Sequence, residues 1–197
     1  MNIIADDKKK LIAYFAGAAR DGSLDRKYFQ IFSASKSWLE NLQVILRNLN
    51  LRSNIYRLKN GYWKLKISKK RILPLLNFIE FRVPQINWET PSFLFGSSQE
   101  ILRWYIGGFF DAEGSVSFSQ KKFPNIEIYQ ANRKVLEDLG AFILELGIRP
   151  TKVIKKKDRN LFCIKITNKR GVEKFKSLIP ILHPEKYKKL FLHTKAP

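Results

Sequence analysis

Two acidic side chains, each followed directly by glycine, are the residues whose type and position could do chemistry. Glu113 is the penultimate residue of the stretch WYIGGFFDAEG, and Asp21 is that of AYFAGAARDG. Gly107 and Gly108 each cost a helix about 1 kcal/mol relative to alanine, so a helix that keeps both lets another backbone approach closely. Gly114 suits the position just past the helix end. Acids also end helices for structural reasons, and one copy alone leaves both interpretations open.

The presence of two such stretches in one chain resembles the paired motifs of single-chain LAGLIDADG homing endonucleases. These are DNA-cleaving enzymes in which two motif helices pack side by side. The resemblance covers nearly the whole chain and implies that Asp21 and Glu113 are the metal-binding carboxylates.

The first motif departs from the second at two positions. Ala19 stands where the second copy has Asp111, and Arg20 stands where it has Ala112. Neither departure removes the final acid. Arg20 and Ala112 are excluded as side-chain ligands of the metal.

The resemblance also implies a cofactor and helper residues. Phosphodiester hydrolysis develops negative charge around the phosphate, so we expect Mg²⁺, or another divalent cation such as Mn²⁺, at the carboxylates. By position, Gln130 and its counterpart Ser33 fit the polar helper role. The lysine often found next in the family is alanine in both halves, so the basic role falls elsewhere. The candidates are Lys36, Lys134 and Lys186, the last expected in the turn after residue 180.

The composition is that of a globular protein with a polyanionic partner. The chain has 197 residues, of which 45% are hydrophobic, enough for a sizeable core in one domain or two fused halves. Lys and Arg total 37 against 17 acids, a net charge of +20, which favours nucleic acid. A basic protein of the ribosome or of a membrane surface is the alternative.

Membrane insertion is not expected, because the apolar run at residues 11–19 is far short of the ~20 residues that a span requires. No signal peptide is visible, so we expect an intracellular, cytoplasmic protein, with an organelle-encoded origin left open. The single cysteine, Cys163, excludes an internal disulfide framework and a Cys-cluster zinc site.

Periodicity and turn residues predict a helix, hairpin, helix, hairpin and helix in the first half. The expected elements are a helix at 11–20, a hairpin within 23–34, a helix capped by Ser35, strands at 51–58 and 62–68 around Asn60-Gly61, and a helix at 69–79. Segment 81–98 breaks this rhythm with two prolines and scattered aromatics, and is interpreted as a linker.

The same order of elements returns after the linker. The expected elements are a helix at 100–113, a hairpin of 115–120 and 125–131, a helix capped by Asn132, strands at 148–157 and 161–167, and a helix from 169 to 180. The repeat is also visible in the residues, since 31–36 resembles 128–133 and 49–52 resembles 146–149. The predicted domains are residues 1–80, the linker 81–98, and residues 99–197.

The fold predicted from this repeat is an α+β protein of two pseudo-symmetric αββαββα units. The motif helices pack at their interface, and the antiparallel sheets form a DNA-binding saddle. Such pseudo-twofold symmetry suits a DNA duplex, whose strands are also related by local twofold axes. We expect a monomer, because both halves of the saddle lie in one chain.

The strands indicate how DNA is held. Alternation in residues 62–68 places Lys64 and Lys66 on one face of the strand and the apolar Leu65 and Ile67 on the other face. A two-stranded ribbon fits the major groove, where Lys and Arg reach phosphates or guanine edges. One polar strand face is also typical of any half-buried sheet, but several strands this basic favour DNA binding. The expected DNA-binding residues are Arg57, Lys59, Lys64, Lys66, Ser115, Ser117, Ser119, Lys155, Lys157, Lys165 and Thr167.

The sequence and the resemblance together predict a site-specific homing endonuclease, with intron or intein origin left open. It binds a long duplex target and makes a metal-dependent double-strand break with short 3′ overhangs. One alternative is a non-cleaving nucleic-acid-binding protein on the same scaffold, an RNA splicing maturase or a DNA-binding regulator. A basic ribosomal or assembly protein is the other. The acid pair discriminates, because a non-cleaving protein has no chemical reason to keep carboxylates facing a polyanion.

Overall fold

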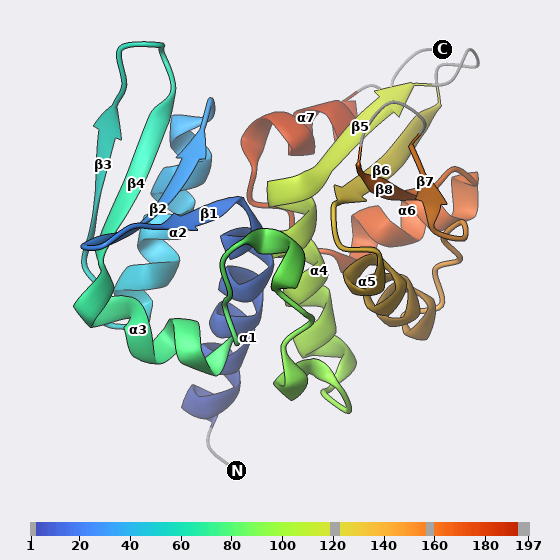
Figure 1. The fold of residues 1–197 in the computed structure, drawn as a ribbon. Coiled ribbons are helices and arrows are strands. Elements are labelled where there is room, and N and C mark those ends of the chain that lie inside the picture. Colours follow the sequence, from blue (N-terminus) through green and yellow to red (C-terminus); the bar gives the residue numbers. More distant parts are fainter. Residues whose placement is uncertain (1–2, 119–122, 157–159, 193–197) are drawn as a thin grey trace.

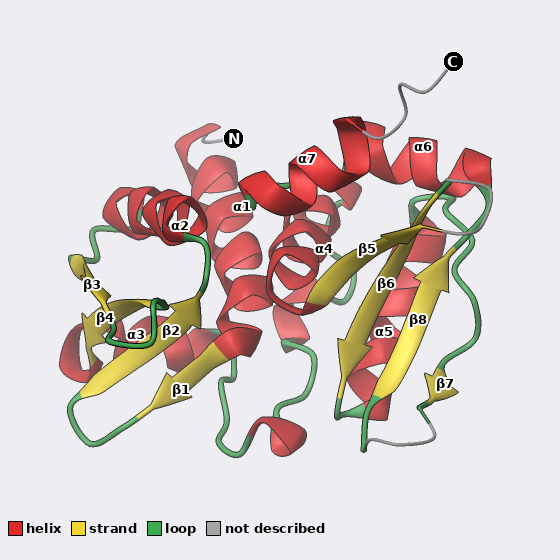
Figure 2. Ribbon diagram, turned by 90° about the horizontal axis from the view of Figure 1, so that it is seen from above, coloured by secondary structure: helices red, strands yellow, loops and turns green. Residues whose placement is uncertain are grey.

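Two similar halves lie on either side of a central pair of helices in the computed structural model, which describes residues 3–118, 123–156 and 160–192 (Figure 1). Each half contributes one helix of the pair and one four-stranded sheet. Seen from above, the sheets flank the central helices (Figure 2). None of the helices within the described ranges is long and apolar enough to cross a membrane.

The first half follows the predicted order of elements. It contains α1 (Ile3–Ala18), the 3-10 turn η1 (Ala19–Asp21), β1 (Gly22–Leu24), β2 (Tyr28–Ser33), α2 (Lys36–Asn48), β3 (Ser53–Arg57), β4 (Trp63–Ser68) and α3 (Lys69–Phe78). The antiparallel sheet has the order β1-β2-β4-β3. Ser35 caps α2 as predicted, because its hydroxyl accepts a 3.4 Å hydrogen bond from the Trp38 amide.

The second half repeats this order. After the 3-10 turns η2 (Gln85–Asn87) and η3 (Ser92–Leu94) it contains α4 (Gln99–Glu113), β5 (Gly114–Phe118), β6 (Pro124–Gln130), α5 (Arg133–Glu145), β7 (Ile154–Lys155), β8 (Phe162–Ile166), α6 (Lys169–Leu178) and α7 (Pro184–Leu192). The sheet order is β5-β6-β8-β7, the counterpart of the first. The predicted α+β fold of two αββαββα repeats is confirmed.

Glycine allows the central helices α1 and α4 to touch backbone to backbone. A Cβ atom on Gly17 would lie 2.4 Å from the Phe109 nitrogen, and one on Gly108 would lie 1.9 Å from the Tyr14 carbonyl oxygen. Gly107 faces the other way, where a Cβ would lie 2.2 Å from the Pro180 oxygen. The close approach expected of the two glycines of α4 is therefore confirmed for both.

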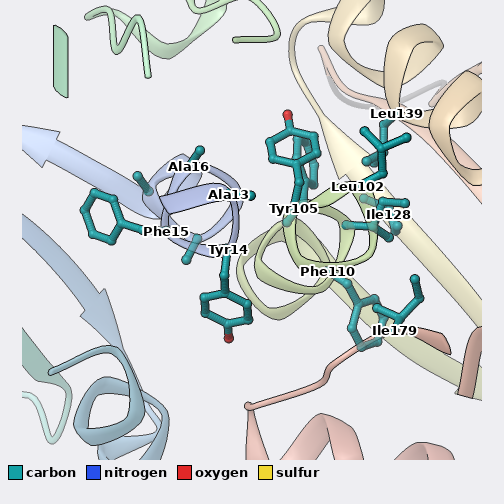
Figure 3. Packing of buried hydrophobic residues seen from close by; sticks show 14 of the residues in the cluster. Ala13, Tyr14, Phe15, Ala16, Leu102, Tyr105, Phe110, Ile128, Leu139 and Ile179 are labelled. Atoms are coloured by element: carbon teal, nitrogen blue, oxygen red, sulfur yellow. The ribbon is translucent and has the colours of Figure 1, made fainter. Parts of the chain in front are cut away.

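Apolar side chains from the helix pair reach the cores of both halves. In Figure 3, Phe15 points from α1 toward the first half, and Phe110 points from α4 toward Ile179. Tyr14 and Tyr105 project on opposite sides of the pair. All five side chains are buried, so the two halves share one core.

The structure corrects the C-terminal half in two places. The strand expected at 148–157 is reduced to the two residues of β7 within the described part of that range. Pro150 has no amide hydrogen to donate, and Thr151 contacts the Lys165 backbone through both its amide and its hydroxyl. The second correction is α7, because residues expected in a turn form a helix with Pro184 at its first position.

Candidate active site and sheet faces

Asp21 and Glu113 end the two central helices on the same side of the molecule. Asp21 is the last residue of η1 and Glu113 is the last residue of α4. Although Asp21 as a residue is exposed, partial burial of its carboxyl group raises its pKa to about 7, and the negative charge of Glu113 adds to the rise. The two carboxylates are therefore close enough to repel each other.

Lys186 brings positive charge to the acid pair from α7, not from a turn as the sequence predicted. Its Nζ donates hydrogen bonds to the main-chain oxygens of Phe110 (3.0 Å), Asp111 (2.6 Å) and Ala112 (3.1 Å), all in the last turn of α4. Burial lowers the Lys186 pKa to about 8, against the opposing charges of Asp111, Asp21 and Glu113. Lys186 thus satisfies the helix end that carries Glu113 and neutralises part of its charge.

Asp111 fastens the segment that leads into α7. Its Oδ2 accepts hydrogen bonds from the Tyr14 hydroxyl (2.5 Å) and from the backbone amides of Leu182 (2.7 Å) and His183 (3.1 Å). Burial raises the Asp111 pKa to about 6, and these donors lower it. Asn41 of α2 donates to the Leu182 carbonyl at 2.7 Å, so both halves hold this segment.

The polar helpers predicted from position occupy matched places in the two sheets. Gly22 pairs with Ile31 in the first sheet, and Gly114 pairs with Ile128 in the second. Ser33 and Gln130 each lie two residues beyond these partners. Gln130 Nε2 lies 3.4 Å from Glu113 Oε1. The Ser33 hydroxyl instead accepts from the Ser35 amide at 3.0 Å.

The other two lysine candidates lie on helix surfaces. Lys134 forms a salt bridge with Asp138 one turn along α5, and hydrogen bonding to Asp138 is the main cause of its raised pKa. Lys36 pairs with Glu40 at 2.7 Å in α2. Their pairing carboxylates belong to their own helices, whereas Lys186 feels the charges of both acids at the candidate site.

Arg20 turns away from the acid pair and holds the connecting segment. Its guanidinium donates to the carbonyls of Trp88 (2.9 Å) and Glu89 (2.8 Å) and lies 3.8 Å from the Trp88 ring centroid. The side chain is buried. This departure from the second motif has a packing function, because it ties the connection between the two halves to the end of α1.

The acid pair fits a divalent cation. Magnesium is commonly bound by one or two carboxylates and keeps several waters, and the mutual repulsion of Asp21 and Glu113 is what a cation between them would relieve. Within the described residues, no three His, Cys, Asp or Glu side chains gather closely enough to form a larger metal site.

The outer faces of the sheets carry part of the predicted set of DNA-binding residues. Lys64 and Lys66 alternate with the buried Leu65 and Ile67, as the sequence predicted. In the second sheet Lys165 is paired with Glu127 at 2.5 Å. Ser115 and Ser117 lie in β5, and Lys59 and Thr167 lie just outside strands. Two of the predicted residues are on the wrong face: Arg57 pairs with Trp63 and Lys155 pairs with Phe162, so both share the face of the core-packed residues. Ser119 and Lys157 lie outside the described residues.

Sequence reasoning missed the contacts that bring Lys186 to the site. A signal was present at His183-Pro184, because proline is favoured at the first position of a helix. The role of Asp111 had no such signal, because its donors Tyr14 and Leu182 lie far from it in sequence.

Comparisons with known proteins identify the same family in both halves of the chain. Residues 100–180 match a family model described as a LAGLIDADG-like domain, and residues 12–93 match one for the WhiA LAGLIDADG-like domain. The chain is 30% identical over 189 residues to the homing endonuclease I-ApeI of Aeropyrum pernix, a match that covers 90% of this chain and 84% of I-ApeI.

Two solved structures share the fold. The structure of I-DmoI in complex with DNA and manganese has a TM-score of 0.63 and 18% identity, covering 87% of this chain and 97% of that one. The N-terminal LAGLIDADG domain of WhiA has a TM-score of 0.64 and 16% identity, covering 88% of this chain and 82% of that one.

Proposed function

The chain belongs to the LAGLIDADG homing endonuclease family, and we propose that it is a DNA endonuclease that makes a metal-dependent double-strand break at a long, specific duplex site. The break leaves short 3′ overhangs, as the family resemblance implies. The protein acts as a monomer inside the cell, where its substrate is found. The observation that carries this proposal is the approach of Asp21 to Glu113 at the ends of two helices in backbone contact.

Each residue of the site has a distinct task. Asp21 and Glu113 would hold a divalent cation such as Mg²⁺ or Mn²⁺, which when bound neutralises charge that develops on the phosphate. Gln130 orients the Glu113 carboxylate from 3.4 Å away. Lys186 adds positive charge beside the reacting phosphate, and Ser33 occupies the place of Gln130 in the other half.

The two sheets hold the duplex on either side of this site. The net charge of +20 supplies attraction to phosphates that does not depend on sequence. Strand residues on the outer faces, such as Lys64, Lys66 and Ser117, reach phosphates and base edges. The proposed halves, residues 1–80 and 99–197, each contact one half of the target.

The test begins by finding the target. The protein is incubated with a plasmid library and Mg²⁺, and the ends that form are sequenced. Asp21→Asn and Glu113→Gln are then compared with wild type on that site. Both changes keep the side-chain shape and remove one negative charge, so we expect cleavage to collapse while DNA binding holds or tightens.

Glu137→Gln is the matched control, because Glu137 is an exposed partner of Arg133 on α5. It removes the same charge away from the acid pair and should cleave normally. Cleavage at the wild-type rate by a folded Asp21→Asn or Glu113→Gln protein would contradict the assignment of that residue. Specific binding without any cleavage by the wild type, across divalent cations, would instead favour the non-cleaving alternative.

A further inference from the structure

A carboxylate lies in the middle of the outer face of the second sheet, between Ser115 and Lys165. Glu127 belongs to β6, where Ile126 and Ile128 on either side of it are buried. Its backbone pairs with Ser115 of β5 on one side and with Lys165 of β8 on the other. These strands lie side by side in Figure 2. Glu127 therefore faces away from the core, on the surface that the proposed function assigns to DNA.

Hydrogen bonds hold this carboxylate in one orientation. Lys165 Nζ donates to Glu127 Oε1 at 2.5 Å, and the Tyr129 hydroxyl donates to Oε2. Tyr129 also hydrogen-bonds Ser115. Each carboxylate oxygen can accept more than one hydrogen bond, and the 12% of the Glu127 side chain that remains exposed is the part that a ligand can reach. The group is fixed before any ligand arrives, which reduces the entropy lost on binding.

The pseudo-equivalent position in the first sheet carries no charge. Gln30 pairs with Lys66 there, in the place that Glu127 and Lys165 occupy in the second sheet, and its Nε2 donates to Asp25 Oδ2 at 2.7 Å. Glutamine offers both donors and acceptors, whereas an ionised carboxylate only accepts. The two halves therefore present different hydrogen-bonding groups at one structural position, as reading a non-palindromic target requires.

Lys165 offsets the charge of Glu127, so the carboxylate can face a phosphate backbone, and its remaining acceptor capacity suits a hydrogen-bond donor as partner. In the major groove that partner is an exocyclic amino group. Cytosine presents N4 as a donor, whereas adenine places the acceptor N7 beside its N6 donor. The carboxylate accepts from cytosine without facing an acceptor, and it rejects guanine and thymine, which place acceptors there.

We propose that Glu127 is a specificity-determining residue that selects a cytosine in the major groove, with Lys165 and Tyr129 as the residues that position it. The proposal rests on the proposed function, because it assigns the outer face of the sheet to DNA. Glu127 pairs with Ser115, two residues beyond Glu113, and a strand rises about 3.3 Å per residue. The selected base pair therefore lies within a few base pairs of the cleaved bond.

The experiment compares base preferences across a library of duplexes randomised at each position of the identified target. Wild type should prefer cytosine at one position near the cleavage site, and Glu127→Gln should reduce that preference roughly tenfold or more while leaving distant positions unchanged. Glu137→Gln removes the same charge from a helix surface and should keep the wild-type profile. Melting temperatures establish that each variant is folded.

A second variant tests the same chemistry by gain of preference. Because the Gln30 amide donates to the Asp25 carboxylate at 2.7 Å, Gln30→Glu is made together with Asp25→Asn, whose amide can donate to the new carboxylate. The change places a carboxylate opposite Lys66 and should create a new preference for cytosine in the other half of the target. If wild type cleaves its target and the base preferences are unchanged in both Glu127→Gln and Gln30→Glu, the proposal for Glu127 is wrong and the proposed endonuclease function still stands. If wild type neither binds nor cleaves duplex DNA, the proposed function fails and takes this proposal with it.

Discussion

The Lys186 ammonium lies 2.6 Å from the main-chain carbonyl oxygen of Asp111, two residues before Glu113. The same nitrogen reaches the carbonyls of Phe110 and Ala112. The C-terminal end of a helix carries partial negative charge. Lys186 therefore lies where the negative charge of a helix end adds to that of two carboxylates. We propose that Lys186 of α7 takes the basic role that the family resemblance places after Gln130, where this chain has alanine.

Replacing Lys186 with methionine keeps an unbranched side chain and removes the charge. We expect single-turnover cleavage to fall about 100-fold, the size of effect seen when one charge-stabilising donor is lost from an active site. DNA affinity should change little, because one of many cations is removed. Lys188→Met is the control, since Lys188 is exposed on the same helix. Equal losses of cleavage in the two variants would contradict a specific role for Lys186.

The raised pKa of Asp21 predicts how metal-free stability depends on pH. Its folded pKa of about 7 lies above its unfolded value, so its stabilising contribution is complete below the unfolded pKa and is lost as pH rises through about 7. In chelator, Asp21→Asn should therefore melt above wild type at pH ~8, with the difference shrinking toward pH ~4. Because Asp21 is exposed, solvent reduces the size of the effect but not its sign.

Adding Mg²⁺ completes this test. A cation bound at the pair stabilises the folded state in proportion to its occupancy, so wild type should gain melting temperature and Asp21→Asn should gain less. The measurement is thermal unfolding across pH, with and without Mg²⁺. A difference between the two proteins that stays constant with pH would show that Asp21 ionises as it does in the unfolded chain.

Features that depend on residues close together in the sequence, such as helix caps and strand alternation, were mostly predicted correctly. Ser35 capped its helix where expected, and the alternation of Lys64 to Ile67 placed basic and apolar side chains correctly. It failed for contacts distant in sequence. Nothing near Lys186 in the chain indicates that it reaches the end of α4, and nothing near Arg20 indicates that it binds the Trp88 carbonyl. The roles of Asp21 and Glu113 remain predictions that the mutants decide.

Gly108 tests whether helix contact is needed for cleavage. A methyl group at this position would lie 1.9 Å from the Tyr14 carbonyl oxygen, so Gly108→Ala must push α1 and α4 apart. We expect destabilisation of roughly 1–3 kcal/mol, as for other overpacked sites, and a loss of cleavage greater than the loss of folded protein.

Gly140→Ala is the control for this change. Gly140 lies in α5, where the nearest contact of an added Cβ is at 4.0 Å, so the change should be neutral or stabilising by up to about 1 kcal/mol. Unfolding and cleavage are measured for both variants. A fully active, fully stable Gly108→Ala protein would contradict the close packing of the motif helices.

The salt dependence of DNA binding should differ between Lys66 and Lys165, although the sequence predicted the same DNA-binding role for both. Each phosphate contact contributes about −0.9 to the slope of log affinity against log salt concentration. Lys66 stacks over the Tyr28 ring and forms no salt bridge with any described residue, so Lys66→Ala should reduce the slope by about 1. Lys165 is paired with Glu127, so Lys165→Ala should weaken binding with a smaller change in slope.

Non-specific binding of each variant to a random duplex is measured by fluorescence anisotropy across a KCl series. Lys9→Ala is the control, because Lys9 lies in the N-terminal part of α1, at the end of the helix away from Asp21. Its slope should match wild type. An unchanged slope for Lys66→Ala would remove Lys66 from the DNA interface, whereas equal reductions for Lys66→Ala and Lys165→Ala would mean that DNA displaces Glu127 from Lys165. In that case the Glu127 carboxylate would no longer be held by Lys165. The salt slopes of Lys66→Ala and Lys165→Ala therefore also report whether the Lys165–Glu127 salt bridge persists when the duplex is bound.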